Sequence, residues 1–278
     1  MTAQTTLVST EELGKNLSSW RLFDCRHDLA KPDLGARQYR EAHIPGALFA
    51  HLEDDLSGPA DGTNGRHPLP DRGAFLAWLG QQGLRDTDQV VCYDAATGSV
   101  AARLWWMLRS IGHEAVAVLD GGIAKWLKEG RAVSAEMPRF AHAAYRVRSW
   151  AVTFVEAGFV EQNLGKALLI DARAPARYRG EQEPIDPVGG HIPGAKNRFC
   201  NDNIAADGSF KPKEVLKQEF AALLGARNPS EVVNYCGSGV SACHNLLAMA
   251  HAGLPGAKLY PGSWSEWICD PRRPQERG

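Results

Sequence analysis

Short runs of apolar, mostly β-branched residues alternate along the chain with longer stretches typical of helices. The runs VVCY at 90–93 and VVNY at 232–235 have the length and composition of buried strands. Each is followed by a loop and then by a helical stretch, SVAARLWWMLRSIG at 99–112 and ACHNLLAMAHAG at 242–253, which a glycine ends. Short strands that alternate with helices predict an α/β fold with a mostly parallel sheet flanked by helices.

The same segments occur twice, in the same order and at a nearly constant offset. The paired segments are LFDCR at 22–26 with LIDAR at 169–173, HIPGA at 43–47 and again at 191–195, VVCYD at 90–94 with VVNYC at 232–236, and LDGGIAKW at 119–126 with LYPGSWSEW at 259–267. A repeat of this length indicates two copies of one domain. We predict domains at 1–137 and 150–278, connected through the stretch 134–149.

Each copy also contains signals for two further helices. The early helices are expected from Ser9 onward and over 152–163, and the middle helices over 71–82 and 212–224. The polar C-terminal stretch PRRPQERG at 271–278 is expected to be disordered.

Composition narrows the class of protein. The 278 residues are 44% hydrophobic and 23% charged, with a formal net charge of −1, so no strong field attracts nucleic acid or an anionic membrane. No apolar run has the length of a membrane span, and the first residues lack the basic start and apolar core of a secretion signal. The spacing of the six cysteines forms no disulfide framework. We expect a cytoplasmic protein with free thiols.

The loop CGSGVSAC at 236–243 follows the second buried strand, at the carboxyl end of the predicted sheet, where α/β proteins place their sites. A zinc site would need a convergent partner pair for Cys236, and a nucleotide-binding loop would need a lysine. A cysteine phosphatase would carry an arginine where Ala242 stands. A buried structural cysteine on a turn stays open as an alternative.

The glycines of this loop favour a reactive cysteine. Gly237 and Gly239 allow the backbone to curl so that successive N–H groups face one point, and the following helix adds the positive end of its dipole. Ser238 and Ser241 can donate further hydrogen bonds. A nest of this kind, without a strongly charged side chain, favours a thiolate or a persulfide at Cys236 over a dianionic phosphate.

At this point the chain resembles, over nearly its whole length, the tandem-domain sulfurtransferases of the rhodanese superfamily. The loop Cys-Gly-Ser-Gly-Val-Ser is similar to that of the 3-mercaptopyruvate sulfurtransferase branch. The resemblance implies that Cys236 carries sulfur as a persulfide from a small donor to a thiol, cyanide or thioredoxin, without a cofactor or metal. Gly237, Gly239, Val240 and Ser241 would line the donor site.

In the first copy, Asp94 stands at the position of Cys236. The resemblance therefore implies that this copy is catalytically inactive.

The resemblance also suggests the groups around the cysteine. Arg177 matches an arginine that binds the donor's carboxylate, and Arg179 is a second candidate. Ser238, His67 and Glu53 match a serine, histidine and acid that handle protons. His43 and His191 occur in both HIPGA segments, which indicates a structural role in the turn.

Ile185 stands where the mercaptopyruvate branch offers a second arginine. Thiosulfate therefore stays open as the preferred donor. A phosphatase-like enzyme and a non-catalytic rhodanese binding module are the more remote alternatives.

Overall fold

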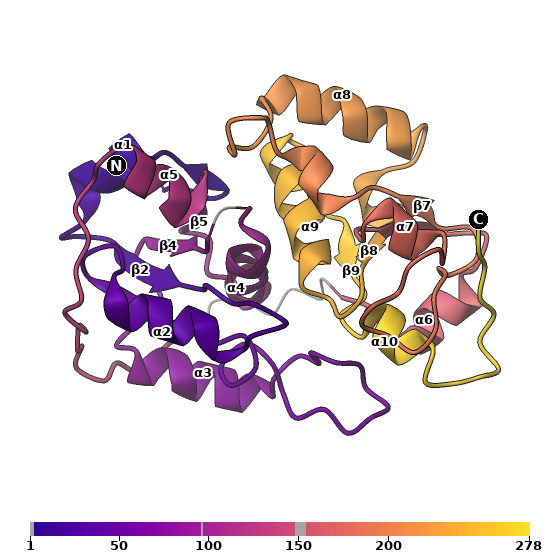
Figure 1. The fold of residues 1–278 in the computed structure, drawn as a ribbon, viewed down its shortest axis with the longest axis horizontal. Helices are drawn as coiled ribbons and strands as arrows, with labels where there is room; N and C mark the ends of the chain where they lie inside the picture. Colours follow the sequence, from indigo (N-terminus) through magenta and orange to yellow (C-terminus); the bar gives the residue numbers. More distant parts are fainter. Residues whose placement is uncertain (1–2, 96, 148–153) are drawn as a thin grey trace. The chain divides into compact units, whose positions relative to one another are not determined.

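The computed structural model describes residues 3–95, 97–147 and 154–278, which divide into two compact units (Figure 1). The N-terminal unit runs through Gly58, continues from Pro70 to the connection, and includes Ala206–Ser209. The C-terminal unit contains Pro59–Leu69, Thr153–Ala205 and Phe210–Gly278. A short segment from the first half of the sequence therefore belongs to the second unit.

The N-terminal unit is built on a five-stranded sheet in which every pair of neighbouring strands is parallel. Its spatial order is β1-β5-β4-β2-β3. The strands are β1 (Leu7–Val8), β2 (Arg21–Asp24), β3 (Ala47–Phe49), β4 (Val90–Tyr93) and β5 (Val116–Leu119). The helices are α1 (Thr10–Asn16), α2 (Asp33–Glu41), α3 (Arg72–Gln81), α4 (Ser99–Ser110) and α5 (Gly122–Lys128).

The C-terminal unit repeats this plan with four parallel strands in the order β7-β6-β8-β9. Phe154 adds a single parallel bridge to Leu259, where the N-terminal unit has β1. The strands are β6 (Leu168–Asp171), β7 (Lys196–Asn197), β8 (Val232–Tyr235) and β9 (Lys258–Leu259). The helices are α6 (Ala157–Gln162), α7 (Pro175–Tyr178), α8 (Lys213–Leu224), α9 (Ser241–His251) and α10 (Ser263–Trp267), with single 3-10 turns at Cys200–Asn203 and Pro229–Glu231.

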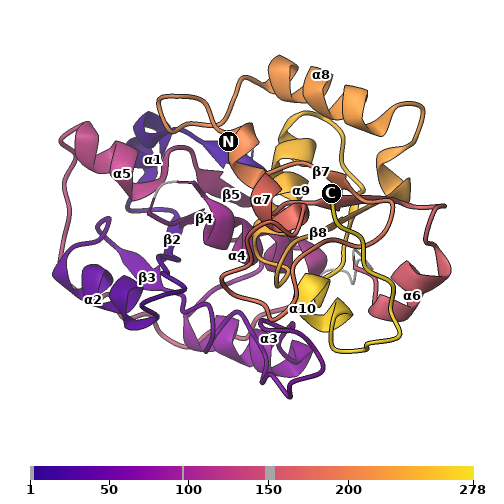
Figure 2. The same ribbon diagram turned by 45° about the vertical axis from the view of Figure 1, so that its right-hand side comes forward.

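The predicted parallel α/β fold is thus confirmed in both units. In each unit a central strand, β4 or β8, is followed by a loop and then by a helix that packs back on the sheet. Helix α4 lies against β4 and β5, and α9 lies against β8 and β9 (Figures 1 and 2). Among the described residues, no helix is long and apolar enough to cross a bilayer.

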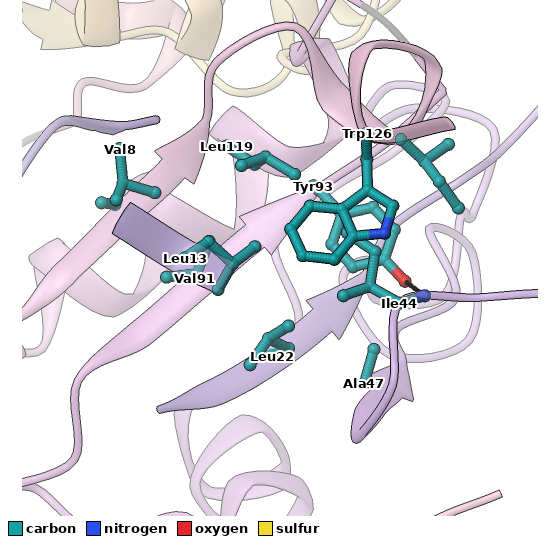
Figure 3. Packing of buried hydrophobic residues seen from close by; sticks show 11 residues of the cluster. Val8, Leu13, Leu22, Ile44, Ala47, Val91, Tyr93, Leu119 and Trp126 are labelled. Atoms are coloured by element: carbon teal, nitrogen blue, oxygen red, sulfur yellow. Dashed lines mark hydrogen bonds between the residues drawn. The ribbon is translucent and has the colours of Figure 1, made fainter. Parts of the chain in front are cut away.

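Each sheet is covered by a core that the repeated segments supply. In the N-terminal unit, Leu22 and Val91 from the strands pack with Ile44 and Trp126 (Figure 3). In the C-terminal unit, the corresponding cluster includes Leu169, Val233, Ile192 and Trp267. Because both faces of a parallel sheet are covered, its strands are apolar on both sides, which explains the uninterrupted VVCY and VVNY runs.

The Asp-x-Arg segment ends β2 and β6 with a buried ion pair. Arg26 donates from Nε and Nη2 to the Asp24 carboxylate, at 3.0 and 2.7 Å, and from Nη2 to the Ala42 carbonyl at 2.7 Å. Arg173 forms the same pair with Asp171, at 3.1 and 2.7 Å, and donates to the Gly190 carbonyl. The accepting carbonyl directly precedes HIPGA, so the ion pair fixes the turn to the end of the strand.

Tyrosine side chains contact the isoleucine and the histidine of each HIPGA segment. The Ile44 N–H donates to the Tyr93 hydroxyl at 3.1 Å, as the dashed line in Figure 3 shows, and Ile192 and Tyr235 form the same contact. His43 stacks on Tyr39 with ring centroids 4.1 Å apart. His191 stacks likewise on Tyr178, at 3.7 Å. These contacts support the structural role expected for the two histidines.

The predicted helix positions mostly agree with the structure. Asp71 is the N-cap of α3 and accepts the Ala74 N–H, and α8 begins one residue after Pro212. The helix expected over 152–163 is shorter, Ala157–Gln162, and its predicted start lies outside the described residues. The sequence analysis missed α2 and α7, which precede HIPGA, and the short strands β3 and β7, which follow it.

The C-terminal stretch is ordered, so the expectation of disorder was wrong. Glu276 and His191 exchange backbone hydrogen bonds at 2.9 Å in both directions. The Trp267 indole N–H donates to the Pro274 carbonyl at 2.8 Å. The tail is polar, but its backbone finds partners on the HIPGA turn and α10.

The last helix of each unit holds the loop that follows the central strand. In the C-terminal unit, Trp264 and Ser265 donate their N–H groups to the carbonyls of Cys236 and Gly237, at 3.0 and 2.9 Å. In the N-terminal unit, Ile123 and Ala124 bind the carbonyls of residues 94 and 95 in the same way, both at 3.0 Å. Gly239 has φ +75, and a β-carbon there would collide with the Pro261 carbonyl.

Replacing Arg173 by Met should lower the free energy of unfolding of the C-terminal unit by about 3–5 kcal/mol, because it leaves the buried Asp171 carboxylate without its partner. A urea titration followed by circular dichroism measures this. Arg272→Met, which removes an exposed guanidinium from the same unit, is the matched control and should unfold like the wild type. Equal stability of the two variants would contradict the structural role of the buried pair.

Replacing Gly239 by Ala should destabilise the C-terminal unit by more than the about 1–2 kcal/mol expected from positive φ alone, because the new β-carbon meets the Pro261 backbone. Gly194→Ala is the matched control, since Gly194 has the same φ of +75 and nothing within 4 Å of its β-carbon position. The two variants are compared by thermal unfolding. If Gly194→Ala were equally or more harmful, the packing of the loop on residue 261 would not matter.

Candidate functional site

Cys236 follows the last residue of β8 and begins the loop to α9. The residue is only 3% exposed, and its Sγ has no hydrogen-bond partner among the described residues. Its N–H donates to Ser263 Oγ at 3.1 Å, and Ser263 Oγ donates to the Tyr260 carbonyl at 2.8 Å. In the described part of the chain, Ser263 is the single non-glycine residue with positive φ, +56. Strain of this kind is kept where it places a functional group.

The loop directs its carbonyls to one side. Those of Cys236 and Gly237 point to the N–H groups of α10. Because a trans peptide holds N–H and C=O on opposite sides, the N–H groups of Gly237 and Ser238 point away from α10. The first turn of α9 follows and leaves its own leading N–H groups without helical partners. The geometry agrees with the anion nest predicted from the two glycines.

The N-terminal unit contains the equivalent loop with an anion in place. The Asp94 carboxylate accepts the N–H groups of Gly98 at 2.8 Å and of Val100 at 3.0 Å, both in the loop and first turn that follow it. The carboxylate is thus bound by the backbone at the position where Cys236 stands in the second unit. In the N-terminal unit, backbone N–H groups of the repeated loop thus bind a carboxylate.

His67 and Ser238 are brought together by the fold. They are 171 positions apart in the sequence, and His67 Nδ1 lies 2.8 Å from Ser238 Oγ. Both residues are buried, at 3% and 5% exposure. His67 reaches the loop because the segment Pro59–Leu69 belongs to the C-terminal unit. A proton can pass between this imidazole and this hydroxyl. Ser238 is two residues after Cys236 in the sequence.

A chain of alternating charges extends from the end of β6 to the same loop. Its members are, in order, Asp171, Arg173, Glu183, Arg177, Asp186 and Arg66, and each is paired with the next. Arg177 donates from Nη2 to Glu183 at 2.7 Å and to Asp186 at 3.0 Å. Arg66 donates from Nη1 to the other Asp186 oxygen at 2.6 Å. The chain fixes two guanidinium groups beside the loop.

Gly237 is the residue that these guanidinium groups flank. A β-carbon at Gly237 would lie 3.0 Å from Arg66 Nη2 and 3.4 Å from Arg177 Nη2. A side chain at this position would therefore displace one or both arginines. The sequence analysis expected Gly237 to help curl the loop, and the structure adds that it makes room for cations.

Glu183 is charged in this arrangement. Burial by itself would raise the pKa of Glu183, but the hydrogen bonds from Arg177 and from the Asp186 N–H outweigh burial and lower the pKa. The carboxylate therefore stays ionised near neutral pH and holds Arg177 in place.

Arg179 is not part of this cluster, and Glu53 belongs to the other unit. Glu53 is exposed in a turn of the N-terminal unit, whereas the other candidates belong to the C-terminal unit. Arg179 donates from Nε and Nη2 to Glu181, at 2.7 and 2.8 Å, and both side chains are about half exposed. Arg179 therefore forms an ion pair on the surface.

Two residues differ from what the sequence led us to expect: Ile185 stands where a second arginine was expected, and Arg66, the neighbour of His67, was not predicted as a site residue. Ile185 is 43% exposed. The signal that could have found Arg66 is the dipeptide Arg66-His67, in which a cation directly precedes a candidate site residue.

The remaining loop residues lead into the helix. Gly239 and Val240 are buried, and Ser241 begins α9. Cys243 Sγ donates to the Gly239 carbonyl at 3.3 Å, so this thiol connects the first turn of α9 to the loop. All six cysteines are free, and Cys269 is the exposed one. The described residues contain no cluster of three or more His, Cys, Asp or Glu able to hold a metal ion.

Comparison with known proteins identifies the family to which this chain belongs. A model of the Rhodanese-like domain matches residues 9–129 and again 156–269. A probable 3-mercaptopyruvate sulfurtransferase of Pseudomonas aeruginosa is 48% identical over 98% of each chain, and a thiosulfate sulfurtransferase of Mus musculus is 36% identical over 94% of this chain and 91% of the relative. The structure of a 3-mercaptopyruvate sulfurtransferase from Leishmania major superposes with a TM-score of 0.85 at 29% identity, over 95% of this chain and 74% of that one. The chain belongs to the rhodanese-like family, in which it carries two copies of the domain.

Proposed function

We propose that this chain is a sulfurtransferase that carries sulfur from a small donor to an acceptor as a persulfide on Cys236. The observation that carries the proposal is a buried thiol without a hydrogen-bond partner among the described residues, at the start of a loop whose counterpart in the other unit binds the Asp94 carboxylate through backbone N–H groups. The names of the relatives, which include both 3-mercaptopyruvate and thiosulfate sulfurtransferases, support the same reaction class.

The first half-reaction takes the sulfur from the donor. With 3-mercaptopyruvate, the Cys236 thiolate attacks the donor's sulfur, the carbon–sulfur bond breaks, and the electron pair leaves on carbon as the enolate of pyruvate. The products are a protonated persulfide on Cys236 and the enolate. The loop N–H groups stabilise the thiolate before transfer and the persulfide anion once its proton has left.

Ser238 and His67 can move the proton that this reaction requires. The persulfide releases its proton and the enolate must take one up at carbon, so a relay between the two sites accelerates the step. The hydroxyl–imidazole contact of 2.8 Å suits that relay. With thiosulfate the leaving group is sulfite, which needs no such proton. The Ser238–His67 pair therefore favours 3-mercaptopyruvate as the donor, with thiosulfate as the alternative.

The second half-reaction returns the thiolate. A thiol, cyanide or reduced thioredoxin attacks the outer sulfur of the persulfide, and Cys236 leaves as the thiolate, so neither a metal nor an organic cofactor takes part. Free cysteines throughout the described chain agree with work in a reducing compartment such as the cytoplasm. In this proposal the domain at 150–278 is catalytic. The domain at 1–137 is inactive because Asp94 stands in place of the cysteine and its carboxylate binds the backbone N–H groups of the loop.

Incubation with 3-mercaptopyruvate, or with thiosulfate, should add one sulfur atom to the peptide that contains Cys236, and a later thiol should remove it. Intact-protein and peptide mass spectrometry measure the gain. Cys236→Ser should gain nothing, whereas Cys243→Ser, the matched control seven positions away, should still be loaded. Absence of the adduct with both donors, together with hydrolysis of an aryl phosphate, would refute sulfur transfer in favour of the phosphatase alternative.

Replacing Ser238 by Ala or His67 by Gln should lower kcat for 3-mercaptopyruvate by about 10²–10⁴-fold, because the enolate loses its proton relay. The rate with thiosulfate should change far less, since sulfite leaves without a proton. Steady-state kinetics with both donors and one acceptor give the comparison. Equal losses for the two donors would assign the pair a structural role in the loop instead.

A further inference from the structure

We propose that Arg66 binds the carboxylate of the sulfur donor at Cys236 and thereby provides the second guanidinium that Ile185 does not. This inference rests on the proposed function, because it concerns the donor of the same site. Three observations on Arg66 support it.

The first observation is that Arg66 is rigidly placed beside the loop. Its N–H donates to Ser265 Oγ at 3.0 Å, and the neighbouring Ser265 N–H binds the Gly237 carbonyl. Gly65, with φ +89, packs so closely on the backbone of Gly262 that a β-carbon would lie 2.8 Å from its carbonyl. One helix, α10, therefore positions both the loop and Arg66.

The second observation is that the binding edge of Arg66 is unused. Among the described residues, the arginines that bind a carboxylate through Nε and Nη2 together are Arg26, Arg173, Arg177, Arg179 and Arg272. Arg66 uses Nη1 for Asp186, whereas its Nε is buried and without a partner in the described residues. A buried donor without a partner is destabilising, and a bound oxyanion would supply the missing acceptor.

The direction of this edge is set by the loop. Nη2 of Arg66 lies beside Gly237, 3.0 Å from where a β-carbon would be. Gly237 directly follows Cys236, so an anion held by this edge lies next to the thiol. The Arg66 side chain is 26% exposed, which leaves access for a small ligand.

The third observation is the place of Arg66 in the chain of charges. Every interior member has an oppositely charged partner on each side, whereas Arg66 ends the chain and, within the described ranges, forms an ion pair only with Asp186. Arg177 has no comparable freedom, because its Nε and Nη2 are engaged by Glu183 and Asp186. A planar carboxylate fits the fork of Arg66, and Nη1 of Arg177 can add a single hydrogen bond.

Two reactions at Cys236 test this assignment. Arg66→Gln should raise KM for 3-mercaptopyruvate and lower kcat/KM by about 10–100-fold, as expected for lost charge-assisted hydrogen bonds. Arg66→Lys should restore only part of the loss, because an ammonium lacks the fork. Thiosulfate, which has no planar carboxylate, should be less affected. Arg272→Gln removes one exposed charge from the same unit and should match the wild type.

The second reaction does not depend on sulfur transfer. Iodoacetate and iodoacetamide both alkylate a thiolate with loss of iodide, but only iodoacetate carries a carboxylate. Arg66→Gln should slow alkylation of Cys236 by iodoacetate relative to iodoacetamide, as measured by mass spectrometry of the Cys236 peptide. Unchanged reaction with iodoacetamide also reports that the variant is folded.

The outcomes separate the two hypotheses. If wild-type Cys236 takes no sulfur from either donor but prefers iodoacetate in an Arg66-dependent way, the carboxylate site stands and the proposed function fails. If sulfur transfer proceeds and Arg66→Gln changes neither KM nor the alkylation ratio, the assignment of Arg66 is overturned. A loss equal for 3-mercaptopyruvate, thiosulfate and iodoacetamide would likewise overturn it, because it would indicate a general role in folding.

Discussion

The buried ion pair of Asp171 and Arg173 connects the fold of the C-terminal unit to its candidate site. It joins the end of β6 to the backbone before HIPGA, and Arg173 extends from there to Glu183. From Glu183 the alternating charges continue to Arg66, beside the loop. Buried charges persist only when each is paired, so the position of one guanidinium constrains the next. In the N-terminal unit the same pair, Asp24 with Arg26, supports the turn alone.

The two units place different side chains at the start of the same repeated loop. Asp94 supplies a carboxylate that the backbone N–H groups bind permanently. Cys236 presents a thiol at the same place, and its N–H and carbonyl are fixed by Ser263 and Trp264. The loop is thus held by its backbone, which leaves the sulfur available. A charged sulfur at this position would be surrounded by donors that need no rearrangement.

Much of the fold and the central residue of the site could be predicted because they depend on local patterns. Strands VVCY and VVNY, their following helices and the duplication were evident from residue type and order. The helices before HIPGA were missed because α2 is largely polar and α7 is a single turn. The ordered tail was missed because its stability comes from distant partners, His191 and Trp267, and not from its own composition.

The sequence by itself determined the α/β repeat, the glycine-rich loop and the single cysteine at its start, because each is written in contiguous residues. Only the tertiary structure decided which distant side chains surround that cysteine. His67 and Arg66 come from a segment of the first half that belongs to the second unit, and Arg179, close to Arg177 in sequence, is held on the surface by Glu181. The physical reason is that charged and polar side chains are fixed by partners far away in the chain, and sequence spacing does not encode those partners.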